Sequence, residues 1–388
     1  MTRTGRLAEA KAVLARLIAF DSVSESSNLP VVDFVEGYLR AHGLECRRAP
    51  NAAGDKAAIL ATIGPRVDGG IVLSGHTDVV PVEGQPWSSP PFSLREASGR
   101  LYGRGACDMK GFDACVLAMA PAFRDAGLKR PVHIVLSYDE ETTCLGSRDV
   151  AAWFGKDEPR PAAAIVGEPT MMEVADAHKG VATLHTRVFG HEAHSALPAL
   201  GANAVAAAAD VVSEIGRLAR EYEEGLRDPR FTPPYSTLHV GIIHGGTARN
   251  ILARECTFHW EFRGLPGVTT ASALAKVQAF VDAVALPRLT RFVTGPSITT
   301  EIESDVPPLR AEPGSAAETL ALRLTRSNER TAVSFATEAG HFQGAGLPAV
   351  ICGPGSIEQA HKPDEFVDES QLAACLAFLD NLAGELTR

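Results

Sequence analysis

Residues 70–78 read GIVLSGHTD, an apolar run that ends in glycine and passes directly into histidine, threonine and aspartate. The apolar part, 70–75, predicts a strand that is buried on both faces. Similar runs recur at 57–63, 132–137, 163–167 and 349–353. Helical periodicity is seen at 5–20, 30–43, 111–123 and 368–386. Because such strands alternate with helices, the sequence predicts an α/β domain with a mostly parallel sheet, in which ligands bind beyond the carboxyl ends of the strands.

The segment 178–305 follows a different pattern. Strands are predicted at 180–189, 239–243 and 257–262, and helices at 203–218 and 272–285. This order indicates a small α+β sandwich. Because the earlier pattern resumes after residue 306, we predict a discontinuous catalytic domain formed by 1–177 and 306–388, with 178–305 as an inserted domain.

Composition excludes several classes of protein. The chain has 388 residues, with 47 acidic side chains against 37 Lys and Arg, a net charge of −10. A nucleic-acid partner is therefore not expected. No apolar run reaches the 18 residues that a membrane span needs, so no membrane partner is expected either. The seven cysteines form no C-x-x-C pair and are odd in number, which favours free thiols in the cytoplasm.

Residues of the types that bind metals follow the predicted strands. They are His76, Asp108, Glu140, Glu141, Glu168 and His361. Any one of them alone is better explained as a structural or surface group. Together, their imidazoles and carboxylates suit Zn²⁺, Co²⁺ or Mn²⁺. We therefore predict a pair of divalent ions at the strand ends.

Each residue can be given a role in such a pair. Asp108 can bridge the two ions, with His76 and Glu168 on one of them. Glu141 and His361 can then bind the other ion. Asp78 can orient the imidazole two residues before it. Glu140 is left free to accept a proton from the attacking water.

Four motifs carry a family resemblance. They read SGHTDVVP at 74–81, LYGRGACDMKG at 101–111, DEE at 139–141 and GEPT at 167–170. In this order they resemble the co-catalytic zinc deacylase and carboxypeptidase family, which includes acetylornithine deacetylase, succinyl-diaminopimelate desuccinylase and aminoacylase. The resemblance implies a zinc-peptidase-like fold, the metal roles given above with zinc as the preferred ion, and a cis peptide bond between Asp108 and Met109.

The inserted domain contains GHEAHSALP at 190–198. From the residues alone, His194 is better explained as a surface group beside a turn. The family resemblance instead implies that His194 reaches the active site of the partner in a homodimer and stabilises an oxyanion there. It also makes the inserted domain a dimerisation or lid domain. By the same resemblance, Asn250 and Arg263 hold the α-carboxylate of an N-acyl amino acid substrate.

Two later motifs bear on the substrate. FATEAG at 335–340 and CGPGSIEQAHKPDE at 352–365 resemble the acetylornithine deacetylase branch most. This implies hydrolysis of N2-acetyl-L-ornithine to ornithine and acetate, a step of arginine biosynthesis. We add the hypothesis that Thr337 binds the substrate carboxylate and that Glu338 faces the cationic side chain.

Other functions stay open at this point. The same chemistry would serve deacylation of acetylcitrulline or succinyl-diaminopimelate, or the cleavage of dipeptides. A catalytically inactive metal-binding scaffold is the alternative from a different class, and the intact Glu140 argues against it. A periplasmic binding protein would also have two α/β lobes, but it would not need histidine and carboxylates at successive strand ends.

Overall fold

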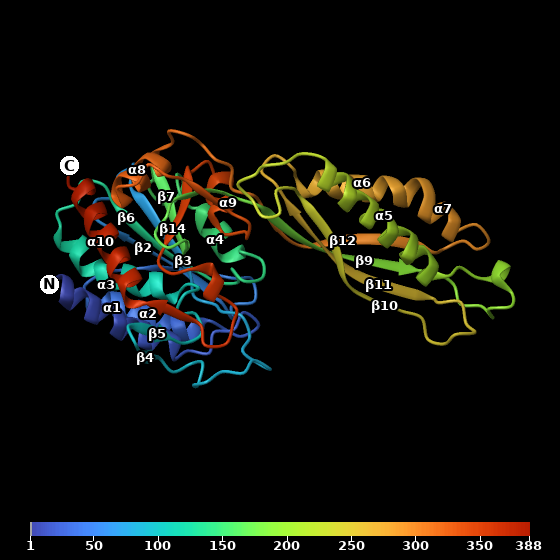
Figure 1. The fold of residues 1–388 in the computed structure, drawn as a ribbon, viewed down its shortest axis with the longest axis horizontal. Coiled ribbons are helices and arrows are strands. Elements are labelled where there is room, and N and C mark those ends of the chain that lie inside the picture. The colour runs from blue at the N-terminus through green and yellow to red at the C-terminus, as the bar shows by residue number, and fades with distance from the viewer. Residues whose placement is uncertain (1) are drawn as a thin grey trace. The chain divides into compact units, whose positions relative to one another are not determined.

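The computed structural model describes residues 2–388 and contains two compact units (Figure 1). The first unit runs up to Ala177 and includes Ala311–Ala332 and Thr337–Arg388. The second consists of His178–Arg310 with Val333–Ala336. The main segment of the second unit thus ends at Arg310, whereas the predicted insertion ended at residue 305.

The first unit is built on an eight-stranded sheet. Its order is β1 (Arg47–Pro50), β2 (Ala57–Ile63), β6 (Val132–Ser137), β3 (Ile71–His76), β7 (Ala163–Pro169), β14 (Ala349–Gly353), β8 (Ala175–His178) and β13 (Thr331–Val333). The central strands β6, β3, β7 and β14 run parallel, while β1, β2 and β8 pair antiparallel with their neighbours. Every residue of β3 and β6 is buried, so the sheet is covered on both faces. The predicted α/β class with a mostly parallel sheet is confirmed.

Helices and a small second sheet complete this unit. The helices are α1 (Arg3–Ile18), α2 (Leu29–Ala41), α3 (Lys110–Asp125), α4 (Leu145–Ala151), α8 (Ala316–Thr325), α9 (Ala339–Gly344) and α10 (Glu369–Leu386). The small sheet has the order β15 (Phe366–Asp368), β5 (Arg100–Tyr102) and β4 (Arg95–Ala97). Helices α1, α3 and α10 pack against one another (Figure 1). Because α3 is almost entirely buried, its first turn is held firmly just after Asp108.

The second unit is a four-stranded antiparallel sheet with helices on one face (Figure 1). The strand order is β10 (Thr237–Gly245), β11 (Glu255–Gly264), β9 (Gly180–Phe189) and β12 (Ser297–Val306). The helices are α5 (Ala204–Glu224), α6 (Thr270–Phe280) and α7 (Leu286–Leu289), with a π-helical turn at Val281–Ala285. Alternate residues of β9 and β11 are buried with these helices in one apolar core. The predicted sandwich thus gains a fourth strand, β12.

Two further properties concern the described chain as a whole. Within residues 2–388, no helix combines the length and apolar character needed to cross a bilayer. All seven cysteines are free thiols, and six of them are buried. Disulfides therefore contribute nothing to the stability of either unit, which depends on its own apolar core.

Candidate metal centre

The parallel strands bring the predicted ligands to one edge of the sheet. β3 ends at His76, β7 carries Glu168 near its end, and β6 leads directly into the loop with Glu140 and Glu141. Since β6, β3 and β7 are neighbours, their carboxyl ends lie side by side. Asp108 joins them from the loop before α3, and the peptide bond that follows it is cis, as predicted.

Two groups of potential metal-binding atoms share Asp108. In the first, Nε2 of His76 lies 3.1 Å from Oδ1 of Asp108 and 3.5 Å from Oε1 of Glu168. In the second, Nε2 of His361 lies 3.3 Å from Oδ2 of Asp108 and 3.0 Å from Oε2 of Glu141. The ligand atoms of each group lie within 4.8 Å of one another. The structure therefore brings all five predicted ligands together and directs one oxygen of Asp108 to each group.

The buried carboxylates at this edge of the sheet are suited to bind divalent cations. Oε1 of Glu141 and Oε1 of Glu168 are buried and accept no hydrogen bond from any described residue. The pKa of Glu141 is raised to about 7 and that of Glu168 well above its usual value, by burial first and by the charge of Asp108 second. Crowded, buried carboxylates stay ionised only beside compensating positive charge. Cations that accept imidazole and carboxylate ligands would supply that charge.

Asp78 orients both His76 and the neighbouring loop. Nδ1 of His76 lies 3.0 Å from the main-chain oxygen of Asp78, which places an imidazole proton on Nδ1 and leaves Nε2, 3.1 Å from Oδ1 of Asp108, as the nitrogen that could bind a cation. The Asp78 carboxylate lies slightly farther from Nδ1, at 3.6 Å. It accepts the main-chain N–H groups of Glu140 at 3.2 Å and Glu141 at 3.3 Å. The sequence predicted that the carboxylate of Asp78 orients the imidazole, whereas the main-chain oxygen is the closer partner of Nδ1; the contact of the carboxylate with the loop was not predicted.

Glu140 stands beside the two groups and belongs to neither. Its Oε2 lies 3.9 Å from Nε2 of His76, and its side chain is almost completely buried. Burial raises the pKa of Glu140 well above its usual value, and the charges of Glu141 and Asp108 add to this effect. A carboxylate with a raised pKa that is not needed as a ligand is suited to accept a proton near neutral pH.

Glu365 fixes the loop that carries Asp108. Its Oε1 accepts the main-chain N–H groups of Cys107 at 2.8 Å and Asp108 at 3.0 Å. Its Oε2 accepts the N–H of Gly105 at 2.9 Å and Nη1–H of Arg104 at 2.8 Å. Sequence analysis gave Glu365 no role, although it lies in the same motif as His361. Its partners are mostly main-chain groups about 257 residues earlier in the chain, and such contacts leave no local pattern.

The hypothesis that Thr337 and Glu338 face the substrate is wrong. Both side chains are completely buried. The hydroxyl groups of Ser74 and Ser137 donate to the two oxygens of Glu338, the latter at 2.7 Å, and the hydroxyl of Thr337 accepts the N–H of Ala339 at 3.1 Å. Glu338 therefore ties α9 to β3 and β6 inside the unit, and its buried side chain does not face a substrate in solvent.

Two predicted residues of the second unit, His194 and Asn250, lie on neighbouring segments. An isolated bridge pairs His194 with Ile251, and the N–H of Ser195 donates to the main-chain oxygen of Asn250 at 3.0 Å. Nδ1 of His194 accepts the N–H of Ala196 at 3.0 Å. The proton of the neutral imidazole is therefore on Nε2, the form that can donate to an oxyanion. Both His194 and Asn250 are exposed.

The third predicted residue of this unit, Arg263, lies near the end of β11. Its Nε and Nη2 donate to the two carboxylate oxygens of Glu261 at 2.7 and 3.1 Å. The guanidinium is thus held in a fixed orientation while the hydrogens of Nη1 take no part in this pair.

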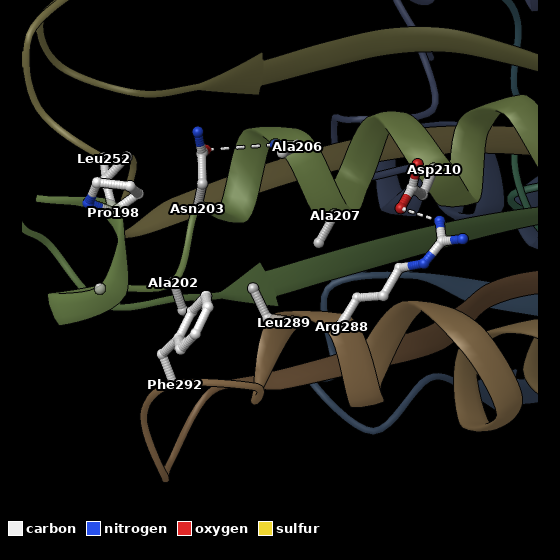
Figure 2. A pocket seen from close by; sticks show the side chains of 11 residues that line it. Pro198, Ala202, Asn203, Ala206, Ala207, Asp210, Leu252, Arg288, Leu289 and Phe292 are labelled. Atoms are coloured by element: carbon white, nitrogen blue, oxygen red, sulfur yellow. Dashed lines mark hydrogen bonds and ion pairs between the residues drawn. The ribbon is translucent and has the colours of Figure 1, made fainter. Parts of the chain in front are cut away.

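A pocket of about 280 Å³ also lies in the second unit (Figure 2). Residues from α5 and α7 contribute to its wall, with Phe292 on one side. The side chain of Asn203 accepts the N–H of Ala206 at the start of α5, and Arg288 donates to Asp210 at 3.1 Å. None of the predicted metal ligands lines this pocket, and these polar groups already pair with each other. It is therefore not the candidate catalytic site.

Comparison with known proteins identifies the family of the chain. The model of peptidase family M20/M25/M40 matches residues 72–385. An acetylornithine deacetylase of Photorhabdus laumondii is 35% identical over 363 residues, which cover 92% of this chain and 91% of the relative. One from Yersinia pseudotuberculosis is 35% identical over 357 residues, covering 90% of this chain and 89% of the relative.

Solved structures agree at the level of the fold. Aminopeptidase PepT from Bacillus cereus has a TM-score of 0.75 at 16% identity, covering 98% of this chain and 99% of its own. The YXEP protein of Bacillus subtilis, described as a dinuclear metal binding peptidase from the M20 family, has a TM-score of 0.67 at 16% identity and covers 98% of both chains. The chain is thus a metal-dependent amidohydrolase that belongs to peptidase family M20/M25/M40.

Proposed function

We propose that this enzyme hydrolyses N2-acetyl-L-ornithine to L-ornithine and acetate at a site that holds two zinc ions, as a step of arginine biosynthesis. The chemistry is inferred from the placement of two carboxylates. Asp108 directs one oxygen to each ligand group, and Glu140 belongs to neither group. The substrate is supported by the relatives named acetylornithine deacetylase, which match along about nine-tenths of the chain.

In this proposal the two groups are the two metal sites. His76, Asp108 and Glu168 hold one ion, and Asp108, Glu141 and His361 hold the other. Zinc is the ion that best suits imidazole and carboxylate ligands at low coordination number, and Co²⁺ and Mn²⁺ are the alternatives. When bound, such ions lower the pKa of a water and polarise a carbonyl group.

The remaining residues carry out the proton transfers and bind the substrate. Glu140 accepts the proton of the attacking water and then returns it to the departing α-amine. The exposed Nε2–H of His194, contributed by a partner subunit, donates to the oxyanion of the tetrahedral intermediate. Asn250 and Arg263 bind the α-carboxylate, for which a guanidinium offers parallel N–H donors.

A panel of N-acyl amino acids tests the substrate. Purified, zinc-loaded enzyme is expected to show its highest kcat/KM with N2-acetyl-L-ornithine, measured by release of free amine. N-acetylcitrulline, N-acetylmethionine, N-succinyl-diaminopimelate and simple dipeptides serve as competitors. A higher kcat/KM for any of them would replace acetylornithine in the proposal, and no turnover of the whole panel would support an inactive scaffold.

The buried position of Glu338 leads to a second expectation. Glu338→Gln should change kcat/KM for N-acetylornithine and N-acetylmethionine by the same factor, because the side chain contacts Ser74 and Ser137 and not solvent. The amide places a donor where a serine hydroxyl now donates, which costs about 1–3 kcal/mol of stability and lowers Tm. A loss confined to acetylornithine would contradict the structural role.

We also propose a homodimer. Ten of the twelve exposed large apolar side chains of the described chain lie in the second unit. They include Ile242 and Ile243 on β10, an edge strand whose main-chain groups are open to pairing. Apolar exposure concentrated in one unit favours association with a second copy. Light scattering of the enzyme as it leaves a size-exclusion column is expected to give twice the mass of the chain.

Mixed dimers test the place of His194. His194→Ala alone is expected to lower kcat roughly 100-fold, as removal of an oxyanion donor does. Co-expression of His194→Ala with Glu140→Gln subunits should recover about a quarter of wild-type activity, because half of the dimers would be mixed and each would contain one intact site. If His194 served its own subunit, the mixture would stay as inactive as its components.

The proposed location is the cytoplasm. All seven cysteines are free, and Cys107 and Cys144 are buried next to Asp108 and Glu140. A reducing compartment keeps such thiols intact. Fractionation of the native host, with a cytoplasmic and a periplasmic marker enzyme, tests this location.

A further inference from the structure

One face of the sheet in the second unit carries a polar cluster that the deacylase chemistry does not use. Strands β11, β9 and β12 are neighbours in this sheet (Figure 1). Every second residue of β9 and β11 is buried on the helix-covered side. His185 of β9, His259 of β11 and Glu303 of β12 lie on the opposite side, with ligand atoms within 4.8 Å of one another. We call these three residues the sheet cluster.

The register of the strands creates this cluster. His259 lies directly opposite His185, and their imidazole rings stack with centroids 4.1 Å apart and planes 7° from parallel. Glu303 occupies the register shift of β12 between Ile302 and Ser304, so it is the extra residue of a bulge. Bulges re-aim side chains, and this one turns the carboxylate toward both rings. Nδ1 of His259 lies 3.3 Å, and Nδ1 of His185 3.7 Å, from oxygens of Glu303.

The groups around His185 favour a neutral imidazole that can act as an acceptor. Nε of Arg187 donates to Nδ1 of His185 at 3.4 Å, so this nitrogen acts as an acceptor and the ring proton is on Nε2. Burial lowers the pKa of His185, and the ring of His259 and the charge of Arg187 lower it further. Arg187 is half exposed and lies 4.0 Å from Glu301. Its guanidinium can therefore leave His185 and pair with Glu301 when a cation binds. The two negative charges of Glu301 and Glu303 then exceed the one positive charge of Arg187, which favours a bound cation.

We propose that the sheet cluster binds one divalent transition-metal ion, independently of the catalytic pair. Two imidazole nitrogens and one carboxylate oxygen are the ligand set that Zn²⁺, Co²⁺, Ni²⁺ and Cu²⁺ accept, whereas Mg²⁺ and Ca²⁺ require mostly oxygen. Three protein ligands leave a further position for water. The ion crosslinks β9, β11 and β12 and stabilises the native state by mass action.

Zinc stoichiometry and thermal stability test the site in the full-length enzyme. After dialysis against buffered zinc, wild type is expected to hold one ion per chain more than His259→Ala. Once the catalytic sites are full, Tm is expected to rise with zinc in wild type but not in His259→Ala. His239→Ala is the matched control, because His239 of β10 pairs with Glu261, two residues from His259 on the same face, and is absent from the cluster. All variants should keep wild-type kcat.

Glu303→Gln serves as a second variant that keeps both imidazoles and is expected to weaken binding of the extra ion at least tenfold. Equal zinc content and equal Tm response in wild type, His259→Ala and Glu303→Gln would overturn the proposal. So would a loss of the same ion in His239→Ala. A change in kcat together with the loss of one ion would assign that ion to the catalytic centre and likewise overturn it.

Discussion

Glu140→Gln is expected to lower kcat roughly 1,000-fold while the metal content of the enzyme stays at the wild-type value. The amide has nearly the same shape as the carboxylate but cannot accept the proton of the attacking water. Metal binding should survive because Glu140 lies outside both ligand groups. The loop should also keep its place, since it is the main-chain N–H of Glu140 that donates to Asp78. Steady-state kinetics and elemental analysis of the same sample measure both quantities.

Asp139→Asn provides the matched control for this variant. Asp139 precedes Glu140, has a positive φ of 57° and pairs with Lys56. Asparagine tolerates this backbone conformation, so the substitution removes one acidic charge from the same loop without displacing it. We expect kcat within a few-fold of wild type. A Glu140→Gln enzyme with more than about a tenth of wild-type kcat, or an equally inactive Asp139→Asn enzyme, would remove Glu140 from the role of general base.

Asp108→Ala is expected to abolish binding of both ions and to reduce activity to background. Its two oxygens are divided between the ligand groups, so the substitution takes a ligand from each of them. The backbone of the loop should stay in place, because Glu365 holds it through main-chain N–H groups that alanine retains. Elemental analysis after dialysis is expected to find about two ions per chain fewer than in wild type, because both catalytic ions are lost.

Ligands that belong to only one of the two groups provide the comparison for Asp108. Glu168 belongs only to the group of His76, and Glu141 only to the group of His361. Glu168→Gln and Glu141→Gln are therefore each expected to lose one ion and to keep the other. If Asp108→Ala lost only one ion relative to wild type, Asp108 would be a terminal ligand and not a bridge. If Glu168→Gln lost both ions, the two groups would not be separate sites.

Much of the catalytic unit could be predicted from local sequence. Buried parallel strands require near-continuous apolar runs, and 57–63, 132–137 and 349–353 form the strands β2, β6 and β14 at those residues. Polar residues directly after such runs must lie at the sheet edge, which is why five ligands from distant segments were identified together. The family motifs then specified which carboxylate would be shared and which would stay free.

Strand β12 could not be predicted from the local sequence pattern. Its sequence, SITTEIESDV at 297–306, has few apolar residues, and much of the strand is exposed at the edge of the sheet. The bulge at Glu303 also interrupts the two-residue period by which strands are recognised. The same bulge creates the sheet cluster, so the irregularity that hid the strand also places a carboxylate beside two imidazoles.

The sequence by itself determined the α/β class and the family, and it predicted the insertion and the metal-binding side chains, because these depend on local periodicity and on short motifs. Only the tertiary structure decided what Glu338 and Glu365 contact, since both bind partners hundreds of residues away in the chain. It also decided that each oxygen of Asp108 faces a different histidine. Such contacts depend on strand register, bulges and loop packing, which bring together groups that have no fixed spacing in the sequence.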